Sequence, residues 1–222
     1  MKDKTTFIRQ KISDSTIRRL SIYLRTLIIL EKGGTVTISS RKLADIEGFT
    51  SAQIRKDLSY FGSFGRRGLG YNVKALKKRI AEILGTNKKW DIILIGMGRL
   101  GSALMNYEEC KGRRFHIKKL FDKNPELIGK KINGITVNSV DQLEKKVNPK
   151  RESLAILAIP PQDVQSLIER LNLIGIKGVL YFASRTVTVP KSMIIRNEDT
   201  TVELETLTYH ITNRTERPVK PM

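Results

Sequence analysis

Apolar residues in the first 86 positions recur at three- and four-residue steps, which is the spacing of one face of an α-helix. Ser13 or Asp14, Ser39 or Ser40, and Thr50 stand where helix caps are expected. The pattern predicts four helices, the first ended by Gly33-Gly34 and the second by Gly48, with a short strand at Val36 and Ile38 between these two. Their inward positions are Ile17, Leu20, Leu24, Leu27 and Ile28; Leu43, Ala44 and Ile46; Ile54, Leu58 and Phe61; and Val73, Leu76, Ile80, Ile83 and Leu84.

The third of these helices has the composition of a helix that reads DNA. Thr50-x-x-Gln53 has the form of a capping box. A glycine-rich segment, predicted to be a hairpin, follows over residues 62–70 and carries Arg66 and Arg67 near its tip. Three helices, a strand and a basic hairpin predict a winged helix-turn-helix with the third helix in the major groove. The alternative is a helical dimerisation or docking domain. The DNA-contacting candidates are Ser51, Gln53, Arg55, Lys56, Ser59, Tyr60, Arg66 and Arg67.

From residue 87 onwards, short apolar runs alternate with helical patterns. The run at 91–95 is continuous and apolar, as in a covered parallel strand. Further strands are predicted at 115–121, 135–137, 154–159, 178–183 and 193–196, with helices at 139–147 and 162–172. This βαβ series predicts a doubly wound parallel sheet. A last helix over 201–213 is apolar at Leu204, Leu207 and Ile211, so it either packs on its own domain or exchanges with a partner subunit.

A dinucleotide motif follows the first of these strands at once. Gly96-x-Gly98-x-x-Gly101 opens the next helix, and the three glycines suit a tight turn, approach of a pyrophosphate, and close helix–strand packing. Asp122 ends the second strand, where an acid binds the adenosine ribose, which favours NAD over NADP although Lys118, Lys119 and Lys123 lie nearby. The predicted cofactor contacts are Gly96, Met97, Gly98, Arg99, Leu100, Gly101 and Asp122, with Ile159, Pro160, Tyr181 and Phe182 toward the nicotinamide.

Composition narrows these predictions further. The net charge is +19, and residues 1–86 carry +11 of it, which suits a polyanionic partner. Cys110 is the only cysteine, and the two histidines, His116 and His210, lack ligand spacing, so we expect no disulfide within the chain and no metal site. The longest apolar run near the N-terminus, Leu27 to Leu30, is too short for a signal peptide or a membrane span. We therefore expect a cytoplasmic protein that does not use a membrane.

Two other functions compete with DNA binding under nucleotide control. An NAD-dependent dehydrogenase would need a proton donor or acceptor beside the nicotinamide. No His-Asp or Tyr-Lys arrangement is placed at a strand end, and His116 lies at the start of its strand. A CoA-binding module would use a similar glycine turn.

The chain resembles the Rex family of redox-sensing transcriptional repressors from Ile17 to Ile211. The most specific matching run is Arg55-Lys56-Asp57-Leu58-Ser59-Tyr60-Phe61-Gly62. The other matching pieces are residues 23–25, 53–54, 68–71, 96–107, 121–122, 158–160 and 175–178.

The resemblance implies a homodimer that binds inverted-repeat operator DNA when NAD⁺ dominates and releases it when NADH binds. It also implies that Arg25, Tyr107 and Asp199 are switch residues and that the C-terminal helix is swapped between subunits. The predicted domains are a winged-helix domain over 1–86, an NAD(H)-binding Rossmann domain over 87–200, and a dimer-contacting helix and tail over 201–222. One departure is Tyr181-Phe182-Ala183-Ser184, where the family usually has Asn-Phe-Ala-Pro.

Overall fold

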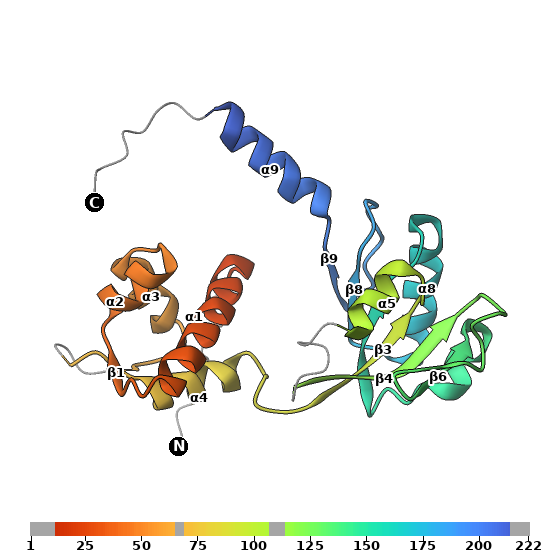
Figure 1. Ribbon diagram of the computed structural model, residues 1–222, viewed down its shortest axis with the longest axis horizontal. Coiled ribbons are helices and arrows are strands. Elements are labelled where there is room, and N and C mark those ends of the chain that lie inside the picture. The colour runs from red at the N-terminus through yellow and green to blue at the C-terminus, as the bar shows by residue number, and fades with distance from the viewer. Residues whose placement is uncertain (1–11, 65–68, 107–113, 214–222) are drawn as a thin grey trace, which may run out of the picture. The chain divides into compact units, whose positions relative to one another are not determined.

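The computed structural model describes residues 12–64, 69–106 and 114–213. The chain divides into two compact units, Met1–Lys88 and Lys89–Met222 (Figure 1).

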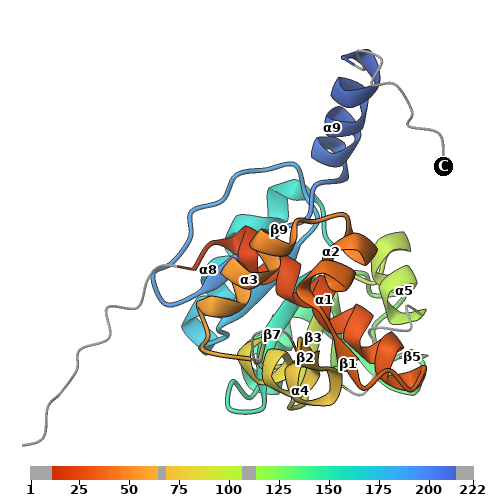
Figure 2. The same ribbon diagram turned by 90° about the vertical axis from the view of Figure 1, so that its left-hand side faces the viewer.

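Over its described residues the first unit contains four helices and a two-stranded antiparallel sheet, and Figure 2 shows their arrangement. In chain order they are α1 (Asp14–Lys32), β1 (Thr37–Ile38), α2 (Ser40–Glu47), α3 (Ser51–Ser59), β2 (Tyr71–Asn72) and α4 (Val73–Ile83). Ser13, Ser39, Thr50 and Asn72 each cap the helix that follows, accepting a backbone N–H through the side chain. The helices enclose one apolar cluster built around Leu20, Leu27, Leu43, Ile54, Leu58, Leu76 and Ile80.

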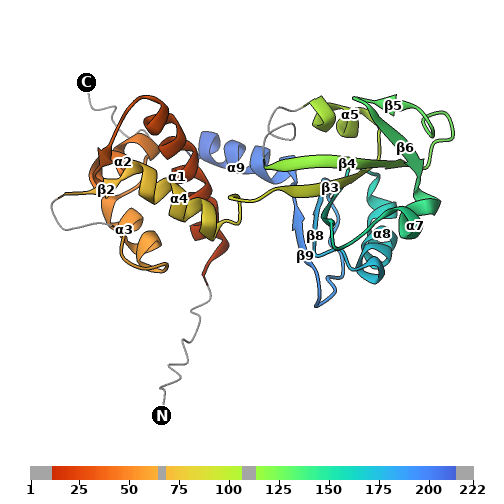
Figure 3. The ribbon, with the colours of Figure 1, turned by 90° about the horizontal axis from the view of Figure 1, so that it is seen from below.

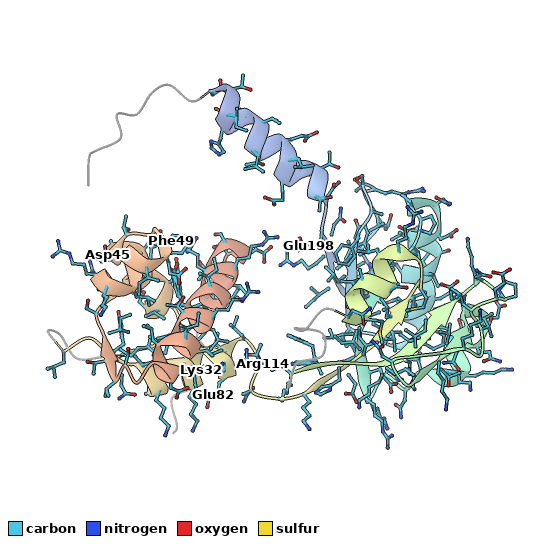
Figure 4. All side chains as sticks on the ribbon, in the orientation of Figure 1. Lys32, Asp45, Phe49, Glu82, Arg114 and Glu198 are labelled. Atoms are coloured by element: carbon cyan, nitrogen blue, oxygen red, sulfur yellow. The ribbon has the colours of Figure 1, made fainter. Side chains whose placement is uncertain are left out.

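An aromatic pair lies at the edge of this cluster. Phe49, labelled in Figure 4, lies edge-on to Tyr23 with ring centroids 5.9 Å apart and an interplanar angle of 80°. This geometry is favourable because the positive edge of one ring meets the negative face of the other. It connects the end of α2 to α1, so the loop before α3 is packed rather than free.

Two predicted core positions of this unit are wrong. Ile17 and Ile46 are 37% and 49% exposed. The buried stripe of α1 follows Thr16, Leu20 and Tyr23 instead, and leaves Ile17 at its edge. On α2 the buried residues are Leu43 and Ala44. The predicted glycine hairpin over 62–70 lies partly outside the described residues, and β2, which follows it, pairs with β1 with Ile38 opposite Tyr71. Arg66 and Arg67 lie outside the described residues.

The second unit contains a seven-stranded sheet in the order β5-β6-β4-β3-β7-β8-β9. All its pairs are parallel except β5 with β6. Without β5, the order β6-β4-β3-β7-β8-β9 is that of the dinucleotide-binding fold. The chain first builds the sheet outward from β3 through β4 to β6 and then returns to add β7 on the other side of β3, so the strand order reverses between β3 and β7. The strands are β3 (Trp90–Ile95), β4 (Phe115–Asp122), β5 (Lys131–Ile132), β6 (Ile135–Ser139), β7 (Glu152–Leu157), β8 (Gly178–Tyr181) and β9 (Ile194–Asn197).

Helices cover both faces of the sheet. Figure 3 shows α5 (Arg99–Asn106) on one face, and α7 (Leu143–Lys146) and α8 (Pro161–Ile174) on the other. The predicted helix over 139–147 is divided into a 3₁₀ turn, η1 (Val140–Gln142), and the single turn α7. Two apolar clusters fill the two sides, one under α8 around Ile93, Ile95, Phe121, Leu157, Val164 and Ile168, and one under α5 around Leu94, Met105, Leu120 and Val137.

The last helix, α9 (Thr200–Thr212), buries none of its residues. Leu204, Leu207 and Ile211 are 61%, 57% and 72% exposed. Among the described residues no helix has both the length and the apolar character needed to cross a bilayer. The same residues contain no cluster of His, Cys, Asp and Glu that could hold a metal ion.

Candidate nucleotide and DNA sites

The glycine turn joins β3 to α5 at the point where the strand order reverses. Gly96 has φ of 95°, and a Cβ there would lie 2.3 Å from the Ala158 carbonyl oxygen. A Cβ on Gly101 would lie 1.9 Å from the Gly96 carbonyl oxygen, so only glycine allows the helix to approach the strand this closely. A Cβ on Gly98 would meet nothing within 4 Å. The open side of the turn is therefore at Gly98, where a pyrophosphate is predicted to approach the backbone.

Helix α5 adds charge complementarity to this turn. Its first i to i−4 bond runs from Ser102 N to Gly98 O at 2.9 Å. The preceding backbone N–H groups are those that a helix leaves without partners inside it. Together with the positive end of the helix dipole, they form an arrangement suited to a phosphate.

Asp122 connects the glycine turn to the neighbouring strand. The carboxylate is 8% exposed and lies at the end of β4. It accepts the Met97 backbone N–H at 2.5 Å and the Asn124 backbone N–H at 2.7 Å. The predicted ribose acid is thus beside the turn and fixes its shape without a ligand.

A cavity of about 420 Å³ opens beside the turn at the carboxyl ends of β3, β4 and β7. Of the predicted cofactor residues, Gly96, Gly98, Asp122, Ile159 and Pro160 line it. Met97 is buried, Gly101 packs against Gly96, and Arg99 and Leu100 are exposed on α5. The cavity therefore brings together residues predicted for both halves of the cofactor, Gly96, Gly98 and Asp122 from one half and Ile159 and Pro160 from the other.

Two of the four residues predicted for the nicotinamide end, Tyr181 and Phe182, lie apart from this cavity. Tyr181 is 4% exposed, and its hydroxyl donates to the Arg185 carbonyl oxygen at 2.7 Å. Burial raises the pKa of the Tyr181 phenol. Phe182 is half-buried against the cluster under α5. Tyr181 lines a separate cavity of about 440 Å³ with Ser184, Arg185, Asn197 and Asp199, among others.

Sequence reasoning did not assign several polar residues of the 420 Å³ cavity to the cofactor site. Lys123, Asp163 and Arg170 line it, and none stands in the glycine motif. Lys123 Nζ lies 2.8 Å from Asp163 Oδ2, and this hydrogen bond raises the pKa of the lysine. Arg170 pairs with Glu144 at 2.7 Å, so its charge is directed toward α7. The signal available in the sequence was position: Lys123 directly follows β4, and Asp163 and Arg170 are on α8, the helix that follows β7.

Of the recognition-helix candidates, Ser51, Gln53, Arg55, Lys56 and Ser59 lie on α3 and Tyr60 is its C-cap, and they differ in exposure. Arg55, Lys56, Ser59 and Tyr60 are exposed, while Ser51 and Gln53 are half-buried. Thr50 Oγ1 accepts the Gln53 N–H at 3.1 Å, as half of the predicted capping box. The Gln53 amide instead donates to Asp57 Oδ1 at 2.8 Å. Arg55 donates to Ser40 Oγ at 3.2 Å, across to the start of α2.

Two of the three predicted switch residues are described. Arg25 is exposed on α1. Asp199 caps α9 by accepting the Thr201 N–H at 2.9 Å. A hydrogen bond from Ser184, with a second from Thr201, lowers the pKa of the Asp199 carboxyl. Tyr107 lies outside the described residues.

Comparison with known proteins agrees with both halves of this description. Residues 11–59 match the model of a putative DNA-binding protein N-terminus, and residues 87–185 match that of a CoA binding domain. The redox-sensing transcriptional repressor Rex of Carboxydothermus hydrogenoformans is 45% identical over 90% of this chain and 97% of its own length. The Rex repressor of Thermus thermophilus is 41% identical over 91% of this chain and 95% of its own.

Solved structures match with the same extent. The repressor RSP in complex with β-NAD⁺ and operator DNA superposes with a TM-score of 0.86 at 37% identity, over 91% of this chain and 94% of the other. RSP in complex with β-NADH superposes with a TM-score of 0.81 at 36% identity, over 91% and 95%. This chain therefore belongs to the Rex family of redox-sensing transcriptional repressors.

Proposed function

We propose that this chain represses transcription by binding operator DNA through α3 and releases that DNA when NADH occupies the cavity beside the glycine turn. The observation that carries the proposal is the conjunction of that turn with a capped basic helix in the other unit. Gly98 is open, Asp122 lies beside it, and Arg55 and Lys56 are exposed on α3. NAD⁺ and NADH are the two ligands we propose.

In this proposal the second unit binds the nucleotide and the first unit binds DNA. Backbone N–H groups at the start of α5 would hold the pyrophosphate, and Asp122 the adenosine ribose. The nicotinamide supplies the redox difference when bound, and only a difference in free energy of binding between two states can move the protein. A coupling of about 1–3 kcal/mol changes operator affinity roughly 5- to 150-fold.

We further propose that the acting form is a homodimer joined by α9. The helix presents apolar side chains to solvent along its length, led by Leu204, Leu207 and Ile211. A second apolar surface of complementary character lies on the sheet, in a cavity of about 540 Å³ lined by residues of β3, β7, β8 and β9. Exposed apolar area of this kind marks association sites. Leu207→Asp should shift the protein toward monomer in analytical ultracentrifugation and weaken binding to a two-half-site operator.

The decisive experiment is release of operator DNA by NADH at fixed NAD⁺. Fluorescence anisotropy of a labelled operator is followed as NADH is added to the full chain. A second titration adds NAD⁺ in place of NADH. We expect NADH to release the operator at concentrations well below those at which NAD⁺ has any effect. Equal effects of the two nucleotides would refute redox sensing, and absence of operator binding under any nucleotide would refute the repressor role.

A second candidate ligand is coenzyme A, since residues 87–185 match the model of a CoA binding domain. Asp122 favours the dinucleotide, because CoA carries a 3′-phosphate on its adenosine ribose that a carboxylate would repel. Direct competition between NADH and CoA, read by nicotinamide fluorescence, separates the two. Displacement of NADH by CoA at equal concentration would favour the second candidate.

Catalysis of hydride transfer is the remaining alternative, and we propose that the protein is not an oxidoreductase. Hydride transfer needs a proton donor or acceptor beside the nicotinamide. Of the residues predicted for that end, only Tyr181 carries such a group, and it is 4% exposed with its hydroxyl donated to the Arg185 carbonyl oxygen. Turnover of NADH with a simple alcohol, aldehyde or hydroxy acid would contradict this proposal.

A further inference from the structure

A buried carboxylate lies beneath the recognition helix. The Asp57 side chain is on α3 and is 0% exposed. Arg19 approaches it with two nitrogens, Nε at 2.6 Å from Oδ2 and Nη2 at 2.8 Å from Oδ1. The Tyr23 hydroxyl donates to Oδ2 at 2.8 Å and the Thr16 hydroxyl to Oδ1 at 3.4 Å. Four of its bonds therefore come from three residues of α1.

The fifth donor belongs to α3 itself. Gln53 is one helical turn before Asp57, and its Nε2 donates to Asp57 Oδ1 at 2.8 Å. Burial opposes ionisation of Asp57, but the hydrogen bonds from Arg19, Tyr23 and Gln53 outweigh it and lower the pKa of the carboxyl. Asp57 is thus a charged acceptor at neutral pH. Charge-assisted hydrogen bonds of this kind are short and directional.

The bond to Asp57 determines which atoms of the Gln53 amide remain for a ligand. An amide has two N–H donors and one carbonyl acceptor. The hydrogen syn to the carbonyl and the carbonyl oxygen lie on one side of the amide, so this pair points away from the carboxylate when the anti hydrogen is the one given to Asp57. A donor and an acceptor side by side match N7 and the N6 amino group of adenine in the major groove. Gln53 is half-buried, so part of the residue remains accessible to solvent.

We propose that Asp57 is a positioning residue for operator readout, which orients Gln53 to bind one adenine in each half-site. The inference rests on the proposed function, because α3 must lie in the major groove for Gln53 to reach a base. It goes beyond that function by naming the base and the residue that sets its recognition. The predicted capping box would pair the Gln53 side chain with the backbone of the N-cap residue, Thr50. In the structure that side chain bonds to Asp57 instead.

The test compares base discrimination rather than affinity alone. Each A·T pair of an operator half-site is replaced in turn, and binding to the full chain is measured by anisotropy. Gln53→Met keeps the length of the side chain but can neither donate nor accept through an amide. We expect it to lose roughly 5- to 150-fold in affinity for the wild-type operator and to become indifferent at one A·T pair only. Gln162→Met, the same substitution at an exposed glutamine of α8 that belongs to neither site, is the matched control and should keep the full profile.

Asp57→Asn tests the positioning role. We expect the same A·T pair to lose discrimination, and the double variant with Gln53→Met to show no further loss at that pair. Binding to unrelated DNA should stay within about twofold of wild type, since phosphate contacts are retained. Discrimination that is unchanged in Gln53→Met, or a loss in Asp57→Asn spread over every base pair, would overturn the proposal.

A measurement on the unsubstituted protein keeps the proposal testable if Asp57→Asn does not fold. ¹⁵N relaxation of side-chain amides reports their order on the ps–ns timescale. We expect the Gln53 amide to be ordered without DNA, and the exposed amide of Gln162 to be mobile. Equal mobility of the two would refute pre-orientation by Asp57. If the wild-type chain binds no operator at all, that result refutes the repressor function. It does not refute the orientation of Gln53 by Asp57.

Discussion

The glycine turn allows one prediction that separates ligand binding from folding. Gly98→Val places a side chain on the open side of the turn, where a Cβ meets nothing within 4 Å. Gly98 accepts the first bond of α5 and so stands at its N-cap, where valine is disfavoured by about 1 kcal/mol. The unit should remain folded, with a melting temperature lowered by about 2–6 °C.

The effect on the nucleotide should be far larger. A backbone N–H bond to a charged phosphate contributes about 1.5–3 kcal/mol. If valine displaces the pyrophosphate from two such donors, the loss is about 3–6 kcal/mol, at least roughly 100-fold in Kd. Gly101→Ala has the opposite profile, because its Cβ would lie 1.9 Å from the Gly96 oxygen and the turn must distort. We expect this variant to lose about 1–3 kcal/mol of stability or more.

The assay pairs nicotinamide fluorescence with thermal melting on the same samples. Gly98→Val should bind operator DNA as well as the wild-type protein but ignore NADH. Nucleotide binding by Gly98→Val within threefold of wild type would refute our assignment of the pyrophosphate to this turn. A fully stable Gly101→Ala would refute the packing argument.

Further predictions concern DNA binding, pH and the ribose acid. Arg55→Ala and Lys56→Ala should weaken operator binding while leaving NADH affinity unchanged, and the residue that contacts phosphate should lower the salt slope by about 1, as read from a salt titration. Asp57 has a lowered pKa in the folded protein, so its stabilisation is complete above the ordinary value near 3.9 and is lost as pH falls through the folded value. The difference in melting temperature between wild type and Asp57→Asn should therefore be largest at pH 7 and shrink below about pH 4; a constant difference would contradict it. Asp122→Ala removes the acceptor of two backbone N–H groups and should weaken NAD⁺ and NADH equally in fluorescence and competition titrations, whereas a selective loss of one would contradict the ribose assignment.

Periodicity and capping predicted most elements of both units. Ser13, Thr50 and the apolar run before Gly96 each indicate an element that the structure contains, because cap and strand signals are local. The strand β5 was missed, although Asn133-Gly134 is a turn signal. Both residues have positive φ, 47° and 79°, and they join β5 to β6 as a hairpin. The strand has only two residues, which gives periodicity nothing to detect.

The candidate sites divide in the same way. The positions of Gly96, Gly98, Gly101 and Asp122 beside one another could be predicted from spacing, since adjacent parallel strands end at one edge of a sheet. The bond from Gln53 to Asp57 could not be predicted so, because it depends on Arg19 and Tyr23 from another helix. Likewise Lys123 and Asp163 come together only when β4 and α8 are placed on the sheet.

The bonds from Met97 and Asn124 to Asp122 have a consequence for selectivity. They shape the loop during folding, so little conformational entropy is left to lose when a dinucleotide arrives. The adenosine diphosphate moiety is chemically the same in the oxidised and reduced coenzymes. A preformed site for this moiety therefore contributes the same binding free energy to NAD⁺ and NADH. The two forms must then be distinguished by side chains that contact the nicotinamide end of the coenzyme.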